Sequence, residues 1–133
     1  MLQAYSVNLT STPNQIIPWN TKAIQRGSTA TLASDGQTIN LNAPGVYEVS
    51  VSGYGSTTAA GTFGLQLNGD GAAIARAASS MSTEAAGVGN AAFTTLVAVN
   101  GVYGSGTKAT LALTYTGAAG TINLASVTVK KVA

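Results

Sequence analysis

The chain has 133 residues, of which only 8% are charged, and its formal net charge is +2. That length suits one domain that buries roughly two thirds of its unfolded surface, and six scattered basic residues exclude a nucleic-acid footprint. Because the sequence contains no histidine and no cysteine, it excludes disulfides, imidazole metal sites and Ser-His or Cys-His catalysis.

The low content of charged residues also indicates how much of the surface faces water. Soluble domains usually carry about 25% charged residues, whereas this chain combines 8% with a mean hydropathy of +0.25. We therefore expect other copies of the chain to cover much of the surface; the alternative is a monomer with an outer face of Ser, Thr, Asn and Gly. The sequence starts without the basic and apolar segments of a signal peptide, and no apolar stretch approaches the ~20 residues of a membrane span. We expect no membrane insertion.

The first fourteen residues form either an N-terminal arm or a first strand, because the alternation over 3–9 is loose and residues 10–14 break it. The apolar run at 15–20 contains Pro18, which cannot donate to a β-ladder and so predicts an edge or a bulge. It also contains the only tryptophan, Trp19. We expect Trp19 to anchor the packing, and the alternative is a platform on which a ligand stacks.

A hairpin and a core strand follow. Residues 28–32 and 37–41 flank Asp35-Gly36, a dipeptide typical of two-residue hairpin turns. A second turn, Pro44-Gly45, then starts a strand in which apolar residues alternate with polar ones. We expect this strand to be half-buried, to end at Gly53 and to organise the domain. Its apolar positions are Tyr47, Val49 and Val51, and its polar positions are Glu48, Ser50 and Ser52.

The middle of the chain is less regular. Residues 54–61 predict a loop, 62–67 a strand with one apolar face, and 68–71 a turn. Asn68 and Asp70 resemble the start of a calcium loop, but the next acidic residue, Glu84, is too far along the chain to complete one. Residues 72–89 fit a strand, a loop or an alanine-rich helix. We predict a strand through Ala78 and then a loop, because the preceding turn presents a returning arm.

The last third of the chain predicts three further strands. Residues 90–99 have apolar side chains on both faces, 100–106 predict a turn, and 107–116 alternate regularly. After a turn at 117–120, the final strand at 121–132 alternates with a phase shift at Ala125-Ser126. Eight or more short strands, with a turn about every ten residues, predict an all-β fold. We expect a two-sheet antiparallel β-sandwich with a jelly-roll topology that spans 1–133 as one domain.

Four segments resemble tumour-necrosis-factor-like jelly rolls, the fold shared with the globular head of the first complement component. The step Pro44-Gly45-Val46-Tyr47 carries most of this resemblance, and the other segments match the order of elements in that family. The sequence is also similar to bacterial and phage members, including phage head-fibre proteins and a glycoprotein of spore surfaces, although no collagen-like stalk precedes it here. The other segments are Ile17-Pro18-Trp19-Asn20, Leu65-Gln66-Leu67-Asn68-Gly69 and Ile122-Asn123-Leu124.

The resemblance implies a compact homotrimer in which three jelly rolls pack around a threefold axis. Four aromatic residues are candidates for its interface: Tyr47, Tyr54, Phe93 and Tyr115. The alternative for each is the core of its own sandwich, since an interface and a core are chemically alike.

An enzyme is the competing class of function. The carboxylates are the only acidic groups, and nothing in the sequence brings two of them together as a glycosidase would need; they are Asp35, Glu48, Asp70 and Glu84. We expect no catalytic, cofactor-binding or metal-binding residues and no cofactor.

We therefore expect a non-enzymatic structural or recognition protein located in a virion. It would be a trimeric phage fibre, head-decoration or receptor-binding component, whose partners are itself and either other virion proteins or a host-surface glycan or protein. The alternatives are a trimeric jelly-roll protein of a bacterial cell or spore surface, and a carbohydrate-binding, lectin-like module in which Trp19 or an exposed tyrosine contacts the sugar.

Overall fold

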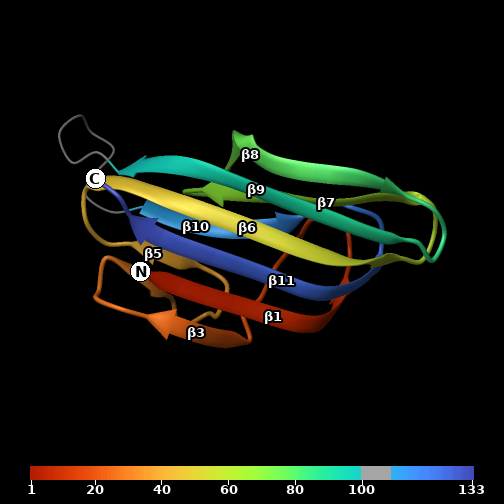
Figure 1. Cartoon of the computed structure of the whole chain (residues 1–133), viewed down its shortest axis with the longest axis horizontal. Helices are drawn as coiled ribbons and strands as arrows, with labels where there is room; N and C mark the ends of the chain where they lie inside the picture. The colour runs from red at the N-terminus through yellow and green to blue at the C-terminus, as the bar shows by residue number, and fades with distance from the viewer. Residues whose placement is uncertain (100–108) are drawn as a thin grey trace.

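The computed structural model describes residues 1–99 and 109–133, which form an antiparallel sandwich of two sheets (Figure 1). One sheet has five strands in the order β3-β1-β11-β6-β9, and the other has the order β4-β5-β10-β7-β8, with β2 paired to β10. The predicted fold class is therefore confirmed. The strands are β1 (Leu2–Ser11), β2 (Gln15–Ile16), β3 (Thr21–Gln25), β4 (Ala30–Leu32), β5 (Ile39–Leu41), β6 (Gly45–Thr57), β7 (Gly61–Gly69), β8 (Ala72–Thr83), β9 (Val88–Val99), β10 (Ala109–Tyr115) and β11 (Gly120–Lys131).

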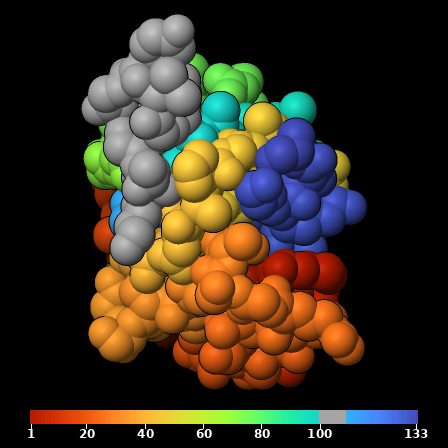
Figure 2. All heavy atoms as spheres, turned by 90° about the vertical axis from the view of Figure 1, so that its left-hand side faces the viewer, coloured from red at the N-terminus to blue at the C-terminus, as the bar shows by residue number. Residues whose placement is uncertain are grey.

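The two ends of the chain meet in the five-stranded sheet. The N-terminal segment is a strand, not an arm, and β1 pairs with β11 from Leu2↔Val129 to Ser11↔Gly120. The first and last strands therefore lie side by side along the sandwich, and both chain termini are at the same end, which Figure 2 views end-on. Among the described residues, no helix has the length and apolar character needed to cross a membrane.

Strand β6 lies between β11 and β9 and supplies much of the core. Tyr47, Val49 and Val51 are buried, as their alternation predicts. The strand does not end at Gly53, however, but continues to Thr57. The backbone of β11 packs closely against Gly55, where a Cβ atom would lie 2.1 Å from the carbonyl oxygen of Thr121. Glycine is thus required inside this strand and does not end it.

Two predicted hairpins are present, but only one has the predicted turn. Asp70 (φ 49°) and Gly71 (φ 84°) form a two-residue turn of type I′ geometry between the paired residues Gly69 and Ala72. The β4–β5 connection is longer than the Asp35-Gly36 dipeptide predicts, because its closing hydrogen bond runs from Ala33 N to Thr38 O (2.8 Å).

Residues 72–89 are neither helix nor loop over most of their length. β8 continues to Thr83, five residues beyond the predicted end at Ala78, and β9 starts at Val88. The pairing of β7 with β8 jumps from Asn68↔Ala73 to Gln66↔Ala78, so β8 bulges there. The amide of Gln66 spans this bulge and donates to the carbonyl oxygens of Ile74 (2.8 Å) and Ala77 (3.2 Å).

The final strand contains the predicted phase shift, although not where the sequence placed it. The register of β11 on β6 slips between Ile122 and Leu124, before the Ala125-Ser126 step. Ile122 is therefore buried, whereas Leu124 turns toward the other face and is only partly buried. The predicted turn at 100–106 and residues 107–108 lie outside the described residues.

The core lies between the sheets. Its largest fully buried side chains are Tyr47, Tyr115 and Phe63, and the rings of Phe63 and Tyr115 meet edge to face with centroids 5.3 Å apart. Aliphatic side chains from nearly every strand complete it.

Candidate functional site: the outer face of the five-stranded sheet

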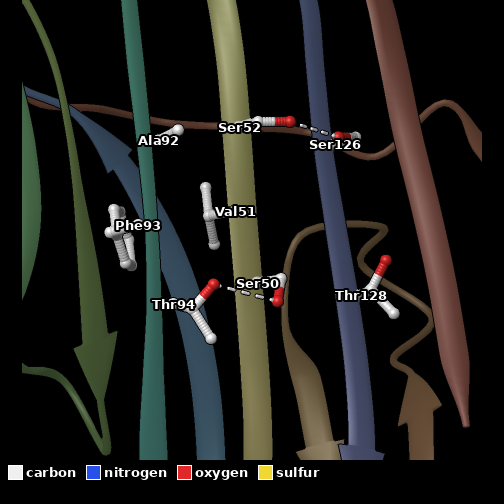
Figure 3. Close-up of a pocket in the computed structure, with 8 residues that line it drawn as sticks. All are labelled: Ser50, Val51, Ser52, Ala92, Phe93, Thr94, Ser126 and Thr128. Carbon is white, nitrogen blue, oxygen red and sulfur yellow. Dashed lines mark hydrogen bonds between the residues drawn. The ribbon is translucent and has the colours of Figure 1, made fainter.

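The side of the five-stranded sheet that points away from the core is open to solvent. Its middle is made of small side chains in two rows across neighbouring strands: Thr128, Ser50 and Thr94 in one row, and Ser126, Ser52 and Ala92 in the other. With the neighbouring Val51 and Phe93, these residues line a shallow depression of about 380 Å³ (Figure 3). We call it the hydroxyl hollow.

The hydroxyl groups of the hollow largely satisfy one another. Ser50 Oγ lies 3.2 Å from Thr94 Oγ1, and Ser52 Oγ lies 2.9 Å from Ser126 Oγ (Figure 3). Burying polar groups that already have hydrogen-bond partners avoids most of the desolvation penalty. The hollow is therefore suited to being covered by a protein surface.

An apolar cluster adjoins the hollow on the same face. Val7 pairs with Leu124, and Leu124 pairs with Tyr54, so the three side chains form a row across β1, β11 and β6. Val7 and Tyr54 are each 45% exposed, and Val88, which pairs with Ser56 at the end of the face, is 68% exposed. Large apolar side chains gathered on one open face are typical of an interaction surface.

Among residues 1–99 and 109–133, the charged side chains in the middle strands of this face form one ion pair. Lys130 Nζ lies 3.5 Å from Glu48 Oε1, and the two side chains are 50% and 36% exposed. Such a half-exposed pair contributes little to stability, and its two charges compensate each other.

The four aromatic residues predicted at the interface separate into two groups. Tyr47 and Tyr115 are completely buried in the sandwich, which corrects their assignment to an interface. Their hydroxyl groups donate to the carbonyl oxygens of Ala43 (2.7 Å) and Ala118 (2.5 Å), and burial raises the pKa of the Tyr115 hydroxyl. Tyr47 and Tyr115 therefore belong to the core of their own sandwich, which was the alternative to an interface.

The other two predicted interface residues remain accessible. Tyr54 is on the outer face, within the apolar cluster. Phe93 pairs with the buried Val51, packs partly against the core and keeps some exposure at the edge strand β9. The interface prediction stays with these two residues.

Trp19 is only 4% exposed, so it anchors the packing as expected. The alternative, a platform on which a ligand stacks, is wrong because the ring is buried. Sequence reasoning missed Val7, Leu124 and Val88. The alternation around Val7 was visible but loose, and the register slip in β11 hid the outward orientation of Leu124.

The four carboxylates lie on different elements and have separate roles. Asp35 accepts hydrogen bonds within its own loop, Glu48 pairs with Lys130, Asp70 accepts one from Thr110 N (2.9 Å), and Glu84 is exposed in the β8–β9 connection. Within residues 1–99 and 109–133, no three His, Cys, Asp or Glu side chains gather in a way that would hold a metal ion.

Comparison with known proteins gives matches only at the level of structure. No family model and no curated protein matches the sequence. The globular domain of zebrafish complement 1qA protein is similar with a TM-score of 0.74 and 10% identity, over 99% of this chain and 96% of that one. Eiger TNF from S. frugiperda is similar with a TM-score of 0.66 and 14% identity, over 98% and 92%.

The chain has the TNF/C1q-like jelly-roll fold. A third similar structure, PRD1 vertex protein P5, has a TM-score of 0.58 and 11% identity, over 99% of this chain and 96% of that one. Proteins with the TNF/C1q-like fold typically trimerise and are typically non-enzymatic.

Proposed function

We propose that this protein is a homotrimeric, non-enzymatic structural or recognition component of a virion, most simply of a phage fibre, head decoration or receptor-binding complex. The outer face of the five-stranded sheet carries the proposal. It is a broad face with an exposed apolar cluster, a hollow in which four of the five hydroxyls pair with one another, and, in the part of the chain that the structure describes, the Lys130–Glu48 ion pair. A surface of this composition is poorly suited to permanent hydration and well suited to contact with an identical neighbour.

The two edges of the five-stranded sheet differ, which supports a ring of copies. The β3 edge carries Lys22 and Arg26, whereas the β9 edge combines Val88 and Leu96, which are 68% and 53% exposed, with Arg76, whose guanidinium donates to the carbonyl oxygen of Leu96 (3.0 Å). The large exposed apolar side chains of the β9 edge suit the outer face of a neighbouring copy better than the β3 edge does. Contact between an edge and a face is heterologous, and heterologous contacts form closed rings such as trimers where the rotation between neighbouring copies closes.

Support for the virion location is of a different kind. The phage vertex protein P5 of PRD1 shares the fold at low identity, and fold alone does not decide function. A trimer would present three identical surfaces together, which strengthens weak contacts to a repeating glycan or capsid lattice through avidity.

Mass in solution tests the trimer. Sedimentation of the purified chain at micromolar concentration should give a species of three times 13.2 kDa, about 40 kDa. A single 13.2 kDa species at that concentration would overturn the proposal.

The genes beside this one test the location. Capsid and tail genes support the virion proposal, whereas sporulation genes favour the alternative of a bacterial cell- or spore-surface trimer. A glycan-array signal that is lost in Tyr54→Ala would favour the lectin-like alternative, with Tyr54 as the exposed aromatic in place of the buried Trp19.

A further inference from the structure

Strand β9 is a free edge of the five-stranded sheet. Within the part of the chain that the structure describes, its one hydrogen-bonded neighbour is β6, and the two strands pair from Gly45↔Val99 to Ser56↔Val88 without a register shift (Figure 1). The other side of β9 therefore presents unpaired backbone N–H and C=O groups. Such a row of groups is a template on which another extended strand can pair.

The other edge strands of the sandwich are protected against such pairing. Natural sheets protect their edges with short strands, charged side chains, prolines or bulges. β3 has five residues and carries Lys22, β4 has three residues, and β8 is bulged and carries Arg76. β9 has 12 residues, none of which is charged or a proline. Its own sequence therefore gives it the least protection of these four edges.

One side chain from the opposite sheet reaches this edge. Arg76 extends from β8, and its guanidinium donates to the carbonyl oxygen of Leu96 (3.0 Å). Since β8 belongs to the other sheet, this carbonyl points to the open side of β9. The N–H and C=O of one residue point the same way in an antiparallel ladder, and the direction alternates along the strand. Asn90, Ala92 and Thr94 therefore also direct their backbone groups to the open side.

These residues are self-complementary in one antiparallel register. When Ala92 lies opposite Ala92 of a second copy, Val88 lies opposite Leu96 and Asn90 lies opposite Thr94. The side chains that are 68% and 53% exposed, Val88 and Leu96, then cover each other, and polar side chains meet polar ones. A shift of two residues places Leu96 opposite Asn90 in one direction and beyond the start of β9 in the other. The sequence therefore favours one register of pairing.

We propose that the open side of β9 is a site for antiparallel pairing with β9 of a second copy, and that Arg76 blocks this site. The contact is isologous, so it closes as a two-fold dimer, and it does not depend on the proposed trimer. Val88 and Leu96 also belong to the edge that suits the outer face of a neighbour in the proposed ring, so the two contacts exclude each other. By occupying the Leu96 carbonyl, Arg76 favours the ring over the strand-paired dimer.

Cysteine cross-linking tests the pairing, because the chain contains no cysteine of its own. Ala92→Cys places two Cα atoms about 5.5 Å apart across the two-fold axis, within the range of a disulfide. Thr94→Cys is the matched control, since Thr94 is exposed on the same face of the same strand. In the proposed register its two copies are four residues apart along the strands, about 13 Å, which is too far for a disulfide.

Arg76→Met removes the guanidinium and keeps an apolar stem. In that background, oxidation of Ala92→Cys by dissolved oxygen should give a cross-linked dimer of about 26 kDa, two times 13.2 kDa. The rate should be at least about fivefold higher than with Arg76 in place, and Thr94→Cys should not cross-link in either background. Lys22→Met removes a positive charge from the exposed strand β3 and should leave the rate unchanged.

Ala92→Pro tests the same contact without a cysteine. It removes an N–H that β6 does not use, so β9 should keep its pairing with β6. Sedimentation of Arg76→Met should show the 26 kDa species, and adding Ala92→Pro should abolish it.

Each failure has its own signature. Absence of cross-linking in Ala92→Cys with Arg76→Met, or equal cross-linking of Thr94→Cys, would overturn the pairing. A rate that Arg76→Met leaves unchanged would overturn the blocking role of Arg76. The mass of the unmodified chain, about 40 kDa or 13.2 kDa, decides the trimer separately, so failure of the pairing and failure of the proposed function are distinguishable.

Discussion

Asp35 holds the β4–β5 connection in place through its carboxylate. Oδ1 accepts hydrogen bonds from Gln37 N (2.8 Å) and Thr38 N (2.9 Å), and Oδ2 accepts one from Thr38 Oγ1 (2.8 Å). The backbone hydrogen bond from Thr38, followed by that from Gln37, lowers the pKa of this carboxyl. The loop therefore depends on the ionised form of one side chain.

A pH dependence follows from the direction of that shift. Because the folded-state pKa of Asp35 lies below its unfolded value, its stabilising effect is fully present above the unfolded pKa, about 3.9, and is lost as pH falls through the folded value. In Asp35→Asn, unfolding by urea between pH 6 and pH 2 should show a smaller acid-induced loss of stability than in the unmodified chain. If the free energy of unfolding fell equally steeply with decreasing pH in both proteins, this role of Asp35 would be contradicted.

Individual residues show where alternation was sufficient and where it was not. Tyr47 shares its parity with Val49 and Val51, so its burial could be predicted. Tyr54 shares parity with Ser50 and Ser52, which predicts that its side chain points to the outer face. This prediction requires the strand to continue beyond Gly53, and nothing in the sequence indicates that a glycine lies inside the strand. The reason for a glycine there, the close approach of β11, exists only in the packed sheet.

At the scale of elements, β8 depends on the amide group of Gln66. Its two N–H hydrogens are shared among the carbonyl oxygens of Leu67 (2.8 Å), Ile74 (2.8 Å) and Ala77 (3.2 Å), which the bulge has removed from the ladder. The side chain therefore substitutes for missing strand pairing at the point where β8 departs from β7.

Replacing this amide tests its role. Gln66→Glu removes the donor and sets a carboxylate against carbonyl oxygens, so we expect a loss of about 1–3 kcal/mol in the free energy of unfolding. Chemical denaturation measures this loss. Gln25→Glu, the same change on the exposed strand β3, should cost less than about 0.5 kcal/mol. Similar losses at both positions would show that Gln66 does not support the bulge.

Elements with strict alternation or a strong turn were predictable, and those shaped by their neighbours were not. The strand at 109–115 and the Asp70-Gly71 turn follow directly from local rules. The length of β8 does not, because its alanines favour a helix and only pairing with β7 holds them extended. The register slip at Ile122–Leu124 likewise arises from pairing with β6. The apolar cluster of the candidate site could therefore not be predicted completely, because the register slip is what places Leu124 on the outer face.

For the whole molecule, the low content of charged residues and the outer face of the five-stranded sheet lead to the same expectation, that other copies of the chain cover this face. Hydroxyl groups that pair with one another replace charges in the centre of the face, and apolar side chains adjoin them. Composition alone indicated that some surface is covered; only the sheet order brings Val7, Tyr54 and Leu124 together from distant parts of the sequence. An assembly through this face should therefore be sensitive to these side chains and indifferent to the outer face of the six-stranded sheet.

Tyr54→Lys tests that asymmetry. Truncating or charging a central aromatic residue of an interface typically costs 2 kcal/mol or more, so the trimer should dissociate at concentrations at least about tenfold higher than in the unmodified chain. Ala78→Lys places the same charge on an exposed position of β8 in the other sheet and should leave the mass unchanged. Sedimentation measures both, and circular dichroism checks that each variant keeps its strands. Equal weakening by the two lysines would mean that net charge governs assembly, and a trimer unaffected by Tyr54→Lys would place its interface on another face.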